Sequence, residues 1–93
     1  MISPIKELPI PDAVRTADRA LEMARIWVAD GDQYVVLSPT LWKDPGAWGL
    51  MLVDLARHVA SAYQAQGSDR GETLARIHAA FQAEWAHPTG ATS

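Results

Sequence analysis

The dipeptide Asp30-Gly31 separates two short runs rich in β-branched and aromatic residues, Ala24–Ala29 and Asp32–Leu37. It favours a two-residue type I′ turn, so the sequence predicts a β-hairpin. Such a turn leaves one register, which places Trp27 directly opposite Tyr34. Because side chains alternate along a strand, one face of the hairpin is apolar and the other is mixed. The apolar face consists of Ala24, Ile26, Val28, Val35 and Leu37, and the mixed face of Arg25, Trp27, Tyr34 and Val36.

Two helices are predicted after the hairpin. Asp44-Pro45 supplies an N-cap followed by the residue best suited to the first helical position, and Gly67 suits the end of that helix. Asp69, with Glu72 three positions later, resembles a capping box and starts a helix that ends at His87-Pro88. Each helix has an apolar stripe. The stripes consist of Trp48, Met51, Leu52, Leu55, Val59, Ala62 and Tyr63, and of Leu74, Ile77, His78, Phe81 and Trp85.

The predicted fold class is α+β: a two-stranded antiparallel β-hairpin packed on two antiparallel helices, with a short N-terminal helix. Three prolines favour an extended arm over residues 1–11, and Asp12 is the expected N-cap of a helix over about 13–21. A chain of 93 residues has room for one domain, expected over residues 12–87, followed by a flexible tail at 88–93. The open edges of the hairpin would allow the sheet to be extended across a dimer.

Composition excludes several classes of protein. The absence of cysteine rules out disulfides, thiolate nucleophiles and cysteine-based zinc sites, and it favours a cytoplasmic location. A net charge of −3 argues against binding to nucleic acid or to an anionic membrane. No apolar run is long enough to span a bilayer, and no phosphate-binding glycine loop occurs, so neither a membrane nor a cofactor is predicted.

A series of short motifs covers residues 20–89. They are Arg25-Ile26-Trp27-Val28, Gly31, Trp42, Asp44-Pro45, Trp48-Gly49, Leu52, Asp54, Arg57-His58, Ala60, Phe81, Glu84-Trp85 and Pro88-Thr89. In this pattern the chain resembles the short bacterial proteins grouped as domain of unknown function 5076. The resemblance implies a stand-alone bacterial domain with no established activity, substrate or cofactor.

The carboxylates and histidines of the two helices are the candidates for a ligand or metal site. Asp54 and His58 lie one helical turn apart, so the carboxylate can orient the imidazole, or the two can form a surface pair in which Arg57 competes. His78 lies within an apolar stripe, where it can be a neutral core histidine or can meet Asp54, His58 and Glu84 around a divalent ion. No complete catalytic set accompanies them, which argues against an enzyme.

Surplus apolar surface is the second functional signal. Trp27 and Tyr34 share the mixed hairpin face, where either a second chain or the N-terminal arm or first helix of the same chain would cover them. The candidate interface consists of Arg25, Trp27, Tyr34, Val36, Leu50 and Val53. We therefore expect a homodimeric protein-interaction module that binds no nucleic acid. The alternative is a small-ligand or metal-binding protein with its site near Asp54, His58 and His78.

Overall fold

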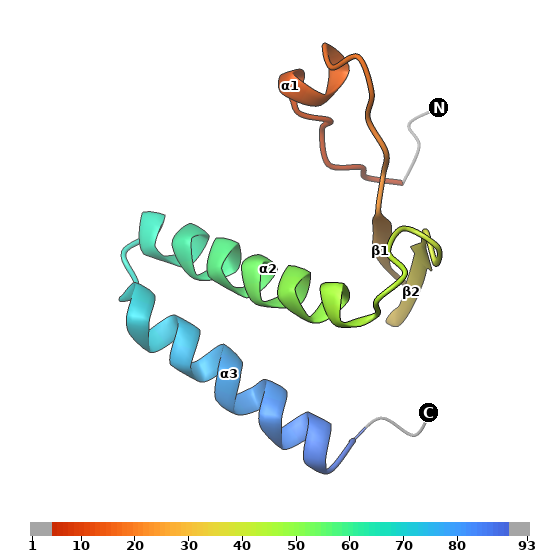
Figure 1. The fold of residues 1–93 in the computed structure, drawn as a ribbon. Coiled ribbons are helices and arrows are strands. Elements are labelled where there is room, and N and C mark those ends of the chain that lie inside the picture. Colours follow the sequence, from red (N-terminus) through yellow and green to blue (C-terminus); the bar gives the residue numbers. More distant parts are fainter. Residues whose placement is uncertain (1–4, 90–93) are drawn as a thin grey trace. The chain divides into compact units, whose positions relative to one another are not determined.

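The computed structural model describes residues 5–89 (Figure 1). Its elements are α1 (Asp12–Arg15), β1 (Ala24–Ala29), β2 (Asp32–Leu37), α2 (Gly46–Ala65) and α3 (Arg70–Ala86). One antiparallel hairpin combined with helices confirms the predicted α+β class. The chain divides into two units, Met1–Leu41 and Trp42–Ser93, and each is described by itself.

The hairpin of the first unit has the predicted register. Trp27 lies opposite Tyr34, and the pairing extends from Ala24 with Leu37 to Ala29 with Asp32. The turn residues Asp30 and Gly31 have φ values of 51° and 85°, as a type I′ turn requires. Local sequence therefore specifies this hairpin completely: the turn sets the register, and the register sets the two faces.

The first helix is shorter than predicted, and its predicted cap is wrong. It covers Asp12–Arg15 rather than 13–21, and Pro11, not Asp12, occupies the N-cap position. The backbone N–H and the hydroxyl of Thr16 both donate to the carbonyl oxygen of Asp12 at 3.0 Å, and the N–H of Ala17 donates to Val14, three residues back, at 3.3 Å. A helix this short gains little stability from its own hydrogen bonds, and it ends in this tighter turn.

The N-cap of α2 is Pro45 rather than the predicted Asp44, which lies one residue earlier. The Asp44 carboxylate accepts a hydrogen bond from the N–H of Gly46 at 2.9 Å, and the N–H of Ala47 donates to the Asp44 carbonyl at 3.1 Å. Pro45 lies between them with φ −62°, a value that its ring imposes in any case. The Asp44 carboxylate therefore satisfies the free N–H of Gly46, the first residue of α2, and Pro45 occupies the N-cap position without strain.

A tight turn joins α2 to α3. The N–H of Gly67 donates to Gln64 and that of Ser68 to Tyr63, which is the hydrogen-bond pattern of a Schellman motif. Gly67 has φ 102°, a conformation that residues with a side chain rarely adopt. The carboxylate of Asp69 then accepts from the N–H of Glu72 at 2.8 Å, so α3 begins at the predicted cap.

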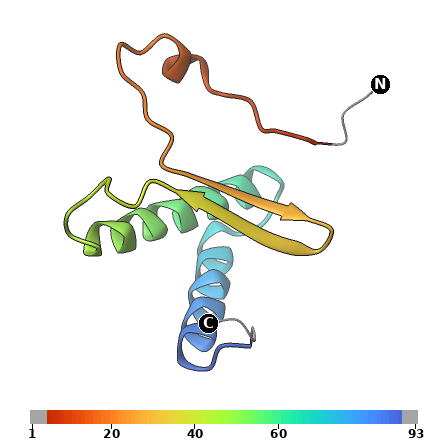
Figure 2. The same ribbon diagram turned by 90° about the vertical axis from the view of Figure 1, so that its right-hand side faces the viewer.

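The two helices meet at this turn and diverge away from it (Figures 1 and 2). Arg70 of α3 donates to the hydroxyl of Ser61 of α2 at 3.1 Å near the turn. Along α3 the side chains become more exposed with distance from the turn: Ile77 is half-buried, whereas Phe81 is 48% and Trp85 is 78% exposed. Trp85, the last residue of the predicted apolar stripe, is thus not buried in the helical unit, because α2 has moved away at that level (Figure 1).

Burial is sparse in both units. Within residues 5–89, Ala60 is the one buried residue. The packing of the hairpin on the helices, and the single domain over residues 12–87, stay predictions. Residues 1–4 of the predicted arm and 90–93 of the predicted tail lie outside the described residues. Across the described part of the chain, no helix combines the length and apolarity that crossing a membrane requires.

Candidate functional site

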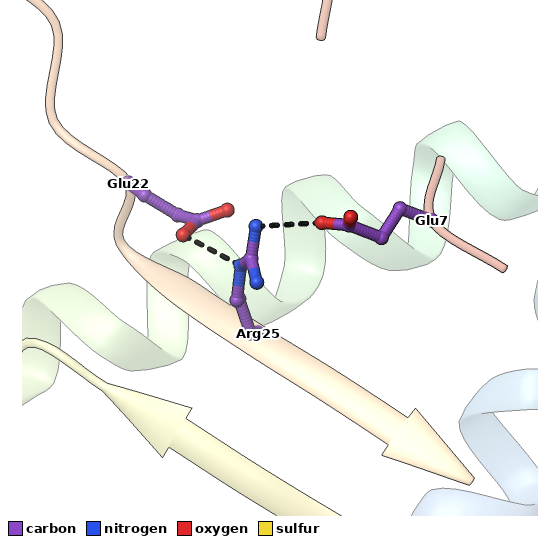
Figure 3. Close-up of polar contacts among 3 residues, drawn as sticks. All are labelled: Glu7, Glu22 and Arg25. Atoms are coloured by element: carbon purple, nitrogen blue, oxygen red, sulfur yellow. Dashed lines mark hydrogen bonds and ion pairs between the residues drawn. The ribbon is translucent and has the colours of Figure 1, made fainter. Parts of the chain in front are cut away.

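Arg25 is the centre of the main polar cluster of the hairpin unit (Figure 3). Its Nε donates to Glu22 at 2.8 Å, and its Nη2 donates to Glu7 at 3.1 Å. Glu22 precedes β1 on the same chain segment, whereas Glu7 comes from the N-terminal arm. One guanidinium therefore joins the arm to the first strand.

The electrostatics of this cluster are those of an exposed ion pair. The hydrogen bond to Glu22, together with the charges of both carboxylates, raises the pKa of Arg25 above its ordinary value. All three side chains remain exposed to water, which screens their attraction. The cluster joins the arm to β1 through exposed contacts, and Arg25 is charged at physiological pH as any arginine is.

Trp27 and Tyr34 form the aromatic pair of the mixed hairpin face. The guanidinium carbon of Arg25 lies 5.8 Å from the centre of the Trp27 ring, which is the spacing of a cation–π contact. Trp27 is half-buried, but Tyr34 is 52% and Val36 is 65% exposed. Within its own unit, this face keeps an aromatic and a β-branched side chain in contact with water.

The hollow next to β1 is too small and too open for an ordinary small-molecule site. It has a volume of about 210 Å³, whereas ligand pockets have about 300–1,000 Å³ and enclose most of their ligand. It is lined by Lys6, Glu7, Leu8, Glu22, Ala24, Arg25, Ile26 and Trp27. Glu7, Glu22 and Arg25 are already paired with one another, which leaves Lys6 as the one charged lining residue outside this cluster.

The helical candidates are not assembled into a metal centre. Asp54 has Arg57 as its neighbour, with 3.9 Å between Oδ1 and Nη1, which is the surface pairing that competes with an Asp54–His58 contact. His58 and His78 are both exposed, so His78 is not the core histidine that its stripe indicates. Within residues 5–89, no three histidine, aspartate or glutamate side chains come together in a way that could hold a metal ion.

Glu84 has a structural role at the end of α3. Its two carboxylate oxygens accept from the N–H and from the hydroxyl of Thr89, each at 2.8 Å. These bonds fold the residues after α3 back on its last turn and occupy both oxygens with contacts inside the chain. Thr89 belongs to the predicted tail, so the start of that tail is anchored.

Sequence reasoning missed Glu7 and Glu22 as partners of Arg25. Glu22 could have been found, because it lies three residues before Arg25 and both are close to a strand start. Glu7 is 18 residues away, and no local pattern predicts a contact over that distance. Leu50, one of the candidate interface residues predicted from the sequence, is 73% exposed.

A family model and a solved structure each match nearly the whole chain. The family model described as domain of unknown function (DUF5076) matches residues 7–89. A solved structure from the photosynthetic bacterium Rhodopseudomonas palustrus CGA009, described as "a putative pyruvate dehydrogenase", is 37% identical and has a TM-score of 0.75. The match covers 99% of this chain and 96% of that one. No curated protein matches the chain.

Proposed function

We propose, from the premise that the chain belongs to the DUF5076 family, that it is a non-enzymatic protein-interaction module that works as a homodimer. The family description assigns no activity, so the proposal depends on the surface of this chain. The observation that carries it is the apolar surface that each unit leaves in contact with water.

The hairpin unit supports the proposal through its mixed face. Tyr34 and Val36 expose more than half of their surface, and they lie on the same face as Trp27. A two-stranded hairpin is marginally stable in water, and it becomes stable when further strands or helices cover it. A second chain would supply further strands and would shield part of this aromatic surface from water.

The helical unit supports the proposal independently. Leu50 and Val53 lie on α2 and are exposed, and Trp85 at the far end of α3 is the most exposed aromatic residue of the described chain. Monomeric proteins seldom expose apolar patches of more than a few hundred Å² unless the patch binds something. Leu50 and Val53 therefore remain candidate interface residues beside the hairpin face.

A non-enzymatic role agrees with the chemistry of the described residues. A catalytic site needs titratable groups that converge in a concave pocket. Here the carboxylates of Glu7, Glu22 and Glu84 are engaged in structural contacts, and the hollow beside β1 is small and open. We therefore do not carry pyruvate dehydrogenase activity over from the description of the structural relative.

Light scattering coupled to size-exclusion chromatography tests the proposal. We expect a mass of about twice the 10.1 kDa of one chain at micromolar concentration. Tyr34→Ser should weaken the dimer at least about tenfold, as aromatic interface residues commonly do. Tyr63→Ser is the matched control, since Tyr63 is 53% exposed and lies on α2, outside the candidate interface. A wild-type mass of one chain would contradict the proposal.

A further inference from the structure

We propose that the second copy pairs with the free edge of β2, so that two hairpins form one four-stranded antiparallel sheet about a two-fold axis at Val35. This inference rests on the proposed homodimer and specifies its interface. Two features of β2 support it. The first is which of its backbone N–H and C=O groups point away from β1, and the second is which residues of the two copies then face each other.

The hydrogen-bond pattern of the hairpin shows which backbone groups of β2 are free. The N–H of Ser38 donates to Met23 at 2.9 Å, one pair beyond the end of the ladder. Hydrogen-bonded pairs alternate along antiparallel strands, so residues 32, 34, 36 and 38 bond to the first strand. The N–H and C=O groups of Gln33, Val35 and Leu37 therefore point away from β1. Among the described residues β2 has a strand neighbour on one side only, so no strand pairs with these groups.

The two strands of the hairpin differ in the features that would prevent pairing with a further strand. β1 carries the N-terminal arm, which is joined to it through the contact of Glu7 with Arg25. β2 has six residues, and it contains no proline, lysine or arginine. Natural edge strands usually avoid pairing by means of such residues, or by a bulge. The regular pairing of β2 with β1 shows no bulge. β2 is therefore the strand that is suited to accept another strand.

Three hydrogen-bonded pairs favour the register centred on Val35. In this register Val35 faces Val35 of the other copy, and Gln33 faces Leu37 twice, which gives about six N–H···O bonds. A register centred on Tyr34 leaves only two such pairs within the strand, because Leu37 would then face the turn residue Gly31. The backbone alone thus selects Val35 as the centre.

The side chains agree with the same register. Tyr34 lies opposite Val36 of the other copy in a pair without hydrogen bonds, where side chains approach most closely. Asp32, the one charged residue of β2, lies opposite Ser38, so no like charges face each other. The apolar faces of both hairpins come to lie on the same side of the four-stranded sheet. The dimer then has the number of strands and the continuous apolar face that an independently stable sheet requires.

Cysteine cross-linking tests the register, because the natural chain contains no cysteine. In the proposed dimer the two Cα atoms at position 35 are about 5.5 Å apart, which a disulfide can bridge. We expect oxidised Val35→Cys to form a covalent dimer on a non-reducing gel. Gln33→Cys alone is the matched control: its two Cα atoms are separated by four residues, about 14 Å, and should stay unlinked. An equal mixture of Gln33→Cys and Leu37→Cys should cross-link, because these positions face each other.

The possible outcomes distinguish a failure of the proposed β2 interface from a failure of the proposed homodimer. A wild-type dimer with cross-linking at position 35 and in the 33/37 mixture, well above the Gln33→Cys background, supports the β2 interface. A wild-type dimer in which neither combination cross-links overturns the β2 interface and leaves the homodimer standing. A wild-type monomer overturns both. The 33/37 mixture decides the question if Val35→Cys loses the far-ultraviolet circular dichroism of the wild type.

Discussion

The N–H of Ser68 donates to the carbonyl oxygen of Tyr63 at 3.1 Å across Gly67, whose φ is 102°. This bond ends α2 and directs the chain into α3. It depends on a backbone conformation in which a side chain is strained, although no atom would lie within 4 Å of an added Cβ. The cost of a substitution at Gly67 is therefore conformational rather than steric.

Gly67→Ala should lower the free energy of unfolding by about 1–2 kcal/mol, because alanine must adopt a left-handed φ. Urea unfolding followed by circular dichroism at fixed protein concentration measures the change. Gly49→Ala is the matched control: Gly49 lies within α2 and has open space around its Cβ, so this variant should be more stable by about 0.5–1 kcal/mol. Equal effects of both variants would contradict the left-handed turn.

Asp69→Ala should destabilise the protein by about 1 kcal/mol, because the N–H of Glu72 loses its acceptor. Asp54→Ala removes the same side chain from an exposed position in the middle of α2, where the contact with Arg57 spans 3.9 Å. That control should change the free energy of unfolding by no more than about 0.5 kcal/mol. If the control lost as much as Asp69→Ala, capping would not explain the effect.

Gly31→Ala should weaken the hairpin by about 1–2 kcal/mol, since Gly31 has φ 85° in the turn. Asp30→Asn, at φ 51°, should be neutral or slightly stabilising, because asparagine tolerates this region best among residues with a side chain. Thermal unfolding compares the two variants with the wild type. A hairpin turn of another type would show no penalty at position 31.

Glu22→Gln should remove the protection of the Arg25 Nε–H from exchange with water, because Glu22 is the charged acceptor of that group. Glu7→Gln is the matched control within the same cluster, since Glu7 accepts from Nη2 and leaves Nε bonded. Heteronuclear NMR of the arginine side chains at neutral pH reads out both variants. If the Nε–H signal of Arg25 were lost in Glu7→Gln and retained in Glu22→Gln, Glu7 rather than Glu22 would be the acceptor of Nε–H.

The predictions from sequence succeeded where residues a few positions apart determine the local structure. Asp30-Gly31 determines the turn and, through it, every cross-strand pair of the hairpin. Asp69 and Gly67 likewise determine where a helix starts and where another ends. The same local rules failed at Asp12, because Pro11 takes the N-cap position and the helix ends after one turn, where the N–H of Ala17 donates to Val14.

The candidate site was less accessible to sequence reasoning. The spacing of Asp54 and His58 allows a contact, but Arg57 lies closer to the carboxylate. His78 follows an apolar pattern, yet its side chain is exposed. A stripe on a helix shows which residues could be buried, and burial itself depends on whether another element lies at that level.

The sequence by itself determined the hairpin register, the turn between the strands, the end of α2 at Gly67 and the start of α3 at Asp69, because the groups that satisfy one another there are a few residues apart. Only the tertiary structure decided that Arg25 reaches Glu7, that Arg70 bonds to Ser61, and that the helices diverge from Gly67 and leave Trp85 exposed. These features depend on how separate segments approach in space, and the free energy of that approach is a sum over contacts that no single segment encodes.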